Sequence, residues 1–417
     1  MSNNRVYYGE YTLKHWIDLM LQHNIELPDY QRSFVWGKED ILRMINSLKE
    51  DLFVPPVTIA HYETTKEKKN LIVDGQQRLT SIFLFAIGFM PDRDKFDKED
   101  ITASGDDSSE DDGSSSPIGY SIKWTFEELV KHHLSIEELR NTLKDNERYI
   151  PLSIPNIINV DDFLKQTFLG FSFIVPDTKK DQSKYFATLF RNINYWGVKL
   201  SPMESRRSLY YMNVSLVKFF DGETSDNKDV LCNIFIQENL QPSKIDFVRY
   251  LSILSQYSID KNADKVLVGY SAYSARENFY ADYISYVVGI EQISRPEKFT
   301  DFDFKTIFPK DCWQLRYDKI RASINILLDK MGLESKGGRK MFTSWIDADY
   351  WLLGLLYIIL FEGKDIDINN DVLKEDITNA ISIKKSNSEY AKSPNRLGHL
   401  RERITESIRI YNKYIQQ

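Results

Sequence analysis

The feature that most constrains this chain is an apolar segment at residues 71–73 that runs directly into Asp74, Gly75 and a stretch with helical spacing. A short apolar run that ends at a glycine predicts a strand, and the periodic apolar positions after it predict a helix. Those positions are Leu79, Ile82, Phe83 and Ala86. The first turn of such a helix has unpaired N–H groups, and the helix dipole favours negative charge there. The junction therefore predicts an anion-binding site.

The polar residues of this junction suit the binding of phosphate groups. Gly75 lets the backbone approach a ligand closely, and the guanidinium of Arg78 can fork onto phosphate oxygens. The amides of Gln76 and Gln77 can donate or accept hydrogen bonds, and Thr80 completes the segment.

Asp74 is the unusual member of the segment, because a carboxylate beside phosphates repels them unless a metal ion or a proton intervenes. We therefore assign Asp74 to Mg²⁺ binding or to the orientation of a water, and Asp74 and Arg78 to catalysis. The simpler alternative is structural, with Asp74 as the helix cap and Arg78 as its ion-pair partner.

Two further motifs accompany this segment. Residues 27–36 have the sequence LPDYQRSFVW, and residues 189–204 have the sequence LFRNINYWGVKLSPME. In this order, the three motifs resemble the N-terminal domain of GmrSD-type, modification-dependent restriction enzymes, which belongs to the ParB/sulfiredoxin-like superfamily. The resemblance covers residues 10–215, with one inserted loop.

The resemblance implies that a nucleoside triphosphate (GTP, ATP or CTP) binds this domain together with Mg²⁺, with Arg32 as a second basic arm. Glu204 can instead close a capping box with Ser201. Tyr195-Trp196 replace the small residues usual in the family, and their rings can stack on a base or cover the core. We assign the nucleotide to Arg32, Gly75, Gln76, Gln77, Thr80, Asn194, Gly197 and Glu204.

Full-length relatives often carry a C-terminal HNH-type nuclease, whose site needs a histidine base and further metal ligands. His399 is the only histidine in the last quarter of this sequence, and no His-Asn-His spacing occurs there. We therefore expect the nuclease domain to be absent or to be supplied by a separate chain. The resemblance further implies phage DNA, in a modified form, as a partner, and self-association into a homo-oligomer.

The acidic residues are concentrated in one place. Residues 92–112 contain ten acids and three bases, a net charge of −7 that equals the charge of the whole chain. The remainder is neutral and lacks the basic balance of a dedicated nucleic-acid binder. Residues 91–119 are also poor in apolar side chains, which predicts a disordered insertion. It is either a solvated insertion or a functional loop that mimics DNA phosphates or tethers a partner.

Cys232 and Cys312 have no metal-ligand spacing, which argues against a zinc site and predicts reduced, buried thiols. Residues 351–361 are apolar but too few to span a membrane, and the N-terminus has no apolar signal segment. These features predict a cytoplasmic protein without a membrane anchor.

The predicted fold class is α+β: a ParB/sulfiredoxin-like mixed α/β domain at residues 1–215 and an all-helical domain at residues 216–417. Three functions agree with this organisation. The first is an NTP-binding and hydrolysing regulator of an anti-phage restriction system. The second is a non-enzymatic sensor of nucleotide or DNA. The third is a metal-dependent DNA nickase with Asp74 and Glu204 as metal ligands.

Overall fold

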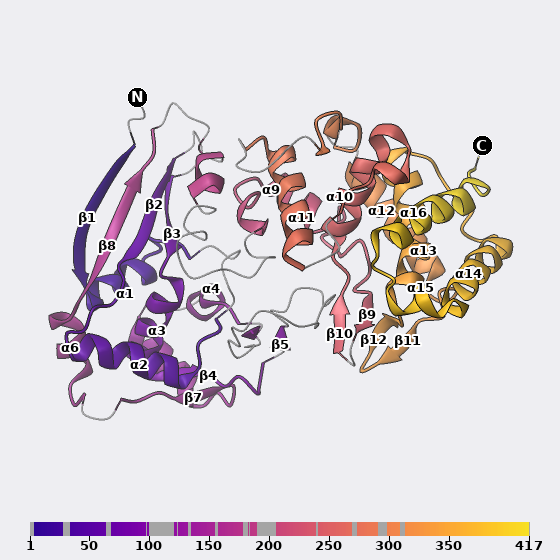
Figure 1. Ribbon diagram of the computed structural model, residues 1–417. Helices are drawn as coiled ribbons and strands as arrows, with labels where there is room; N and C mark the ends of the chain where they lie inside the picture. Colours follow the sequence, from indigo (N-terminus) through magenta and orange to yellow (C-terminus); the bar gives the residue numbers. More distant parts are fainter. Residues whose placement is uncertain are drawn as a thin grey trace. The chain divides into compact units, whose positions relative to one another are not determined.

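A computed structural model shows two compact units, which meet along the chain at residues 209 and 210 (Figure 1). The sequence analysis placed this boundary a few residues later, at 215–216. The structure describes residues 4–27, 34–63, 68–96, 98–99, 121–122, 124–131, 135–154, 157–177, 182, 184–189, 206–238, 241–268, 273–290, 298–308 and 313–416.

The N-terminal unit is built on a four-stranded sheet with the strand order β1-β8-β2-β3 (Figure 1). The outer pairs β1–β8 and β2–β3 are antiparallel, whereas the central pair β2–β8 is parallel. The sequence analysis expected β3 from its apolar residues 71–73 and did not identify β1. Residues 5–10 of β1 are all exposed, so this edge strand lacks the apolar alternation that reveals a buried strand. The bounds are β1 Arg5–Thr12, β2 Val57–Glu63, β3 Lys68–Asp74 and β8 Phe168–Val175.

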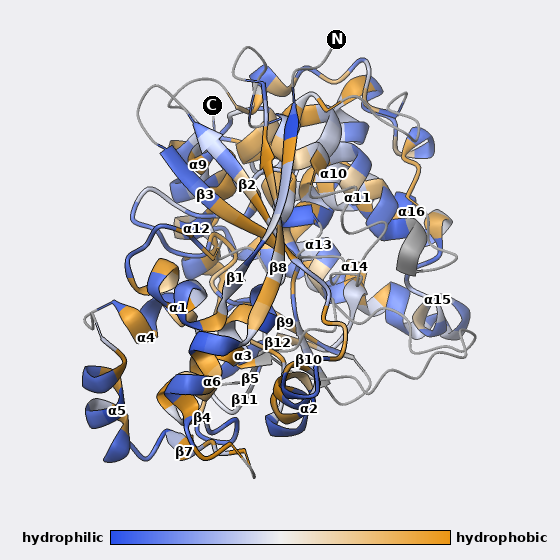
Figure 2. Ribbon diagram, turned by 90° about the vertical axis from the view of Figure 1, so that its left-hand side faces the viewer, coloured by the Kyte–Doolittle hydropathy of each residue, from blue (hydrophilic) through white to orange (hydrophobic). Residues whose placement is uncertain are grey.

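Helices pack beside this sheet, and α3 is the most deeply buried of those described, since every residue from 79 to 87 is buried. The outer helix α5 is mostly hydrophilic in Figure 2, and only Leu139 and Leu143 on it are buried. Helix α1 begins after Thr12, whose hydroxyl accepts a hydrogen bond from the His15 N–H at 3.1 Å and caps the helix. The bounds are α1 Leu13–Leu21, α2 Lys38–Lys49, α3 Gln76–Ile87, α4 Phe126–Val130, α5 Ile136–Lys144 and α6 Val160–Gln166.

Two short strand pairs flank the acidic insertion: β4 (Phe89–Pro91) pairs with β7 (Tyr149–Pro151), and β5 (Lys98–Glu99) pairs with β6 (Ser121–Ile122). Most of residues 91–119 lie outside the described residues, so the disorder expected there stays a prediction. At its start the expectation is wrong, because Pro91 belongs to β4 and Phe96 is buried.

The C-terminal unit is mainly helical, which confirms the α+β class for the whole chain. It is not all-helical, however, because it contains a second four-stranded sheet in the order β10-β9-β12-β11. These strands are three or four residues long, too short for an alternating pattern to distinguish them from loops. Their bounds are β9 Phe235–Glu238, β10 Gln241–Lys244, β11 Glu334–Lys336 and β12 Arg339–Phe342.

The core of this unit is formed by α13, all of whose residues are buried, as the apolar stretch predicts. It continues into the π-helical turn η4, and no described helix has the length and apolarity that a membrane span needs. Cys232 is only half-buried, contrary to expectation, and its thiol contacts the Asn325 side chain at 3.2 Å. The helices are α9 Val214–Phe220, α10 Phe247–Asp260, η1 Ala263–Lys265, α11 Tyr273–Val288, η3 Phe304–Thr306, α12 Trp313–Leu327, α13 Trp345–Leu356, η4 Tyr357–Phe361, α14 Asp371–Ser386, α15 Ser388–Lys392 and α16 Leu397–Asn412.

Three helices of this core are joined by a buried ionic cluster. Arg249 of α10 donates two hydrogen bonds to the Asp349 carboxylate of α13, at 2.6 and 3.0 Å. Arg403 of α16 donates from Nε to the same carboxylate at 2.9 Å, and the Tyr250 hydroxyl donates to it at 3.0 Å. The side chains of Asp349 and Arg403 are fully buried, so water cannot replace these bonds.

Candidate functional site

The predicted anion site lies where β3 ends and α3 begins. Asp74 is the last residue of β3, and Gly75 caps α3 in the left-handed conformation, with φ of 99°. A β-carbon on Gly75 would lie 3.0 Å from Val57 Cγ2 and 3.1 Å from Arg78 Nη2. Glycine is therefore favoured here both by conformation and by space. Because the N-cap residue is a glycine, it offers no side-chain hydrogen bond to this end of the helix.

The charged residues of the junction form an ion pair. Arg78 Nη2 donates to Asp74 Oδ2 at 2.8 Å and to the Pro56 carbonyl at 3.2 Å. The Asp74 side chain is 46% exposed, whereas that of Arg78 is 14% exposed. The pairing foreseen by the structural alternative is thus present, but the capping role is not, because the cap is Gly75. Arg78 Nε is buried and has no hydrogen-bond partner among the residues that the structure describes.

The two amides of the first helical turn have different surroundings. Gln77 Oε1 accepts a hydrogen bond from the Val35 N–H at 3.1 Å. Gln76 Oε1 is buried and accepts no hydrogen bond from the described part of the chain. Thr80 lies one turn further along α3 and is only 2% exposed, so it belongs to the buried part of the helix. The side chain of Gln76 therefore leaves an unused polar group next to the N-terminus of α3.

Arg93 is a basic residue at this junction that the sequence analysis counted only as part of the acidic insertion. Its Nη1 donates to the Val35 carbonyl at 2.7 Å. Because Gln77 holds the N–H of the same residue, both peptide groups of Val35 are fixed. The segment that follows the PDYQR motif is thereby fastened to the first turn of α3. No local pattern in the sequence could reveal this contact, since Arg93 and Val35 are separated by 58 residues.

Four assigned residues, Arg32, Asn194, Gly197 and Glu204, lie outside the described residues, as do Tyr195 and Trp196. The structure thus brings together Asp74, Gly75, Gln76, Gln77 and Arg78, and the roles of the other four stay predictions. Within the described ranges, no group of three or more His, Cys, Asp and Glu side chains is placed to hold a metal ion.

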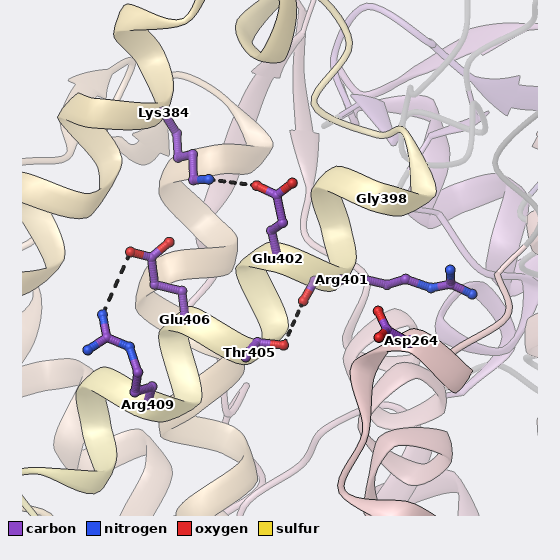
Figure 3. Close-up of a pocket in the computed structure, with 8 residues that line it drawn as sticks. All are labelled: Asp264, Lys384, Gly398, Arg401, Glu402, Thr405, Glu406 and Arg409. Carbon is purple, nitrogen blue, oxygen red and sulfur yellow. Dashed lines mark hydrogen bonds and ion pairs between the residues drawn. The ribbon is translucent and has the colours of Figure 1, made fainter.

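The C-terminal unit has an open pocket, in which the charged side chains neutralise one another (Figure 3). Lys384 and Glu402 are 2.6 Å apart, and Glu406 accepts a hydrogen bond from the Tyr350 hydroxyl at 2.5 Å. Arg401 points away from Glu402 in Figure 3 and donates to the Val266 carbonyl at 3.0 Å. The lining residues are Asp264, Lys384, Gly398, Arg401, Glu402, Thr405, Glu406 and Arg409. Three acids face three bases, so this pocket has no excess charge with which to attract an anion.

Comparison with known proteins places the N-terminal unit in a family. Residues 14–211 match the family model described as the N-terminal domain of the GmrSD restriction endonuclease, so this part of the chain is a domain of that family. The recognition made from the three motifs is confirmed.

An uncharacterized protein of Methanocaldococcus jannaschii is 26% identical to the chain over 275 residues. The match covers 49% of this chain and 44% of the relative, so the chain spans less than half the length of that protein. No solved structure gives a significant match.

Proposed function

We propose that this protein is the nucleotide-dependent regulator of a DNA restriction system, and that its triphosphate binds at the N-terminus of α3. The domain family supports the restriction role, because its name describes a restriction endonuclease, an enzyme that acts on DNA. The observation that carries the nucleotide site is the start of α3 at Gly75, which has no side chain to cap it, with Gln76 Oε1 and Arg78 Nε beside it unpaired among the described residues.

The chemistry of these residues fits a phosphate group. The helix dipole favours an anion at the first turn of α3, and the Gly75 backbone leaves room for close approach. Arg78 is already placed at this turn by its contacts with Asp74 and the Pro56 carbonyl, so its guanidinium has only to exchange Asp74 for a phosphate oxygen. The Gln76 amide can present either its oxygen or its NH₂ group, because the two are interchanged by a rotation about χ3.

The donor set also fits a Mg²⁺ ion that arrives with the triphosphate. Mg²⁺ binds one or two carboxylates, water and substrate phosphates, and prefers these to a cage made only of protein ligands. Asp74 can supply one such carboxylate, since it is half-exposed and one of its oxygens, Oδ1, is not used by Arg78. The ion would shield Asp74 from the phosphates, and Arg78 would then be released to bind phosphate oxygens.

The direct test is to titrate the purified protein with each of the four NTPs in Mg²⁺, followed by phosphate release with and without phage DNA. We expect one NTP to bind, with release that DNA accelerates. Replacement Arg78→Gln should weaken binding at least tenfold, about 1.4 kcal/mol, because the charged phosphate contact is lost. Arg43 lies on the surface of α2 with its side chain 78% exposed, so Arg43→Gln is the matched control and should bind normally. Normal binding by the Arg78→Gln protein would contradict the proposal.

A second candidate is a sensor that binds nucleotide without hydrolysing it. The 2.8 Å ion pair favours it, because a carboxylate neutralised by Arg78 is a weaker metal ligand than a free one. Tight binding with no phosphate release, in the presence of DNA, would establish the sensor. The nickase alternative requires Mg²⁺-dependent cleavage of plasmid DNA that Asp74→Asn abolishes.

A further inference from the structure

The hairpin of β11 and β12 presents an exposed basic tip on the C-terminal unit, at the edge where Figure 1 draws the second sheet. Gly337 and Gly338 form its two-residue turn, with φ of 57° and 78°. Positive φ at both positions is the signature of a tight type I′ turn, which fixes the register of the two strands. A β-carbon at either glycine would have no atom within 4 Å, so the turn stands clear of the rest of the unit.

Basic residues flank this turn, and two of them, Arg339 and Lys340 on β12, form no ion pair with a described acidic residue. The sequence from 334 to 340 contains three bases, Lys336, Arg339 and Lys340, and one acid, Glu334. Arg339 is exposed, and its guanidinium lies 5.2 Å from the centre of the Phe235 ring on β9. That cation–π contact holds the side chain without neutralising its charge. The tip therefore keeps a positive charge in a chain whose overall charge is −7.

We propose that this basic hairpin, residues 334–342, contacts the phosphate backbone of double-stranded DNA. DNA carries a regular array of negative charges and therefore attracts a basic hairpin even in a protein whose net charge is negative. A protein surface of mixed charge would attract the hairpin less strongly. The open Gly337-Gly338 turn removes side-chain bulk where the backbone would meet phosphates. Contacts of these side chains with phosphate oxygens would position the DNA and carry no sequence information.

The salt dependence of DNA binding tests this proposal. Each lost phosphate contact lowers the slope of log K against log salt by about 0.9. The double variant Arg339→Gln/Lys340→Gln should therefore reduce the slope by nearly two. Between 50 and 200 mM KCl, the unmodified protein should lose about tenfold more affinity for a duplex than the variant does.

The matched control is Lys319→Gln/Lys364→Gln, which removes the same charge from lysines that already pair with Asp365 and Glu362. Its slope should equal that of the unmodified protein. An unchanged slope in the hairpin variant, an equal reduction in the control, or no duplex binding by the unmodified protein would overturn the proposal. Nucleotide binding is measured on the same samples. If no NTP binds while the hairpin still sets the DNA slope, the proposed nucleotide site fails and the DNA contact stands.

Discussion

Each unit contains an aspartate bound by arginine, but the two sites differ in exposure and in role. In the N-terminal unit, Asp74 and Arg78 are neighbours on one strand–helix junction, and the carboxylate is half-exposed. In the C-terminal unit, Asp349 is fully buried and is bound by Arg249 and Arg403 from two other helices. An exposed pair can exchange its partner for a ligand at little cost, whereas a buried pair leaves an uncompensated charge when it opens. The first arrangement is suited to binding and the second to holding helices together.

The largest effect should come from removing the central carboxylate of the buried cluster. Replacement Asp349→Ala removes the buried carboxylate that Arg249 and Arg403 both contact, and we expect a loss of about 3–5 kcal/mol in the free energy of unfolding. Urea denaturation of the whole chain measures it. The control Asp365→Ala removes a carboxylate that is 54% exposed and should cost less than about 1 kcal/mol. Equal losses of unfolding free energy in Asp349→Ala and Asp365→Ala would show that the buried carboxylate contributes no more than an exposed one.

The pH dependence of stability should show the same cluster. Burial acts to raise the pKa of Asp349, but Arg249 and Arg403 outweigh it and hold the pKa below its usual value. A carboxyl with a lowered folded-state pKa stabilises the protein above its unfolded-state pKa of about 3.9. This stability is lost as the pH falls through the folded-state pKa. The acid-induced loss should be smaller in Asp349→Asn than in the unmodified protein, as followed by circular dichroism.

The two units can also be compared by the packing around a glycine in each. Gly354 of α13 lies against α16, where an added β-carbon would come within 2.4 Å of Tyr411 Cδ2 and 2.5 Å of the Ser407 carbonyl. Gly354→Ala should therefore cost about 1–3 kcal/mol through overpacking. Gly398→Ala on α16 is the control, because nothing lies within 4 Å of that position. If the Gly354→Ala protein were as stable as the unmodified protein, α13 and α16 would be able to separate freely.

The corresponding change in the N-terminal unit is Gly75→Ala. It places a β-carbon in the left-handed region and should cost about 1–2 kcal/mol. Since the same carbon would contact Arg78, nucleotide binding should fall together with stability. Gly37 caps α2 with φ of −84° and has space around it, so Gly37→Ala should affect neither property. Calorimetric titration with NTP, paired with thermal unfolding, separates the two effects.

The smallest expected change in stability comes from opening the exposed pair. Asp74→Asn should alter the free energy of unfolding by no more than about 1 kcal/mol, because the pair is half-exposed and only four residues apart. Its Mg²⁺-dependent nucleotide binding should nevertheless weaken. A large loss of stability with unchanged binding would instead make the pair structural, like the cluster around Asp349.

Local patterns in the sequence accounted for much of the N-terminal unit. The strand at residues 71–73 and the helix after Gly75 were both predicted, since each depends on residues within one or two turns of chain. The three ordered motifs also identified the domain family. The edge strand β1 escaped prediction, because it is exposed on both faces and gains its partner from residues 168–175.

The sequence by itself determined where the helices start, which residues crowd the junction at Gly75 and which family the domain belongs to. These properties follow from capping, periodicity and glycine conformation, which act between near neighbours. Only the tertiary structure decided that Arg93 holds Val35 and that Asp349 joins Arg249 and Arg403. The reason is physical: such contacts link residues 54 to 100 positions apart, and packing of the whole unit determines which buried charges meet.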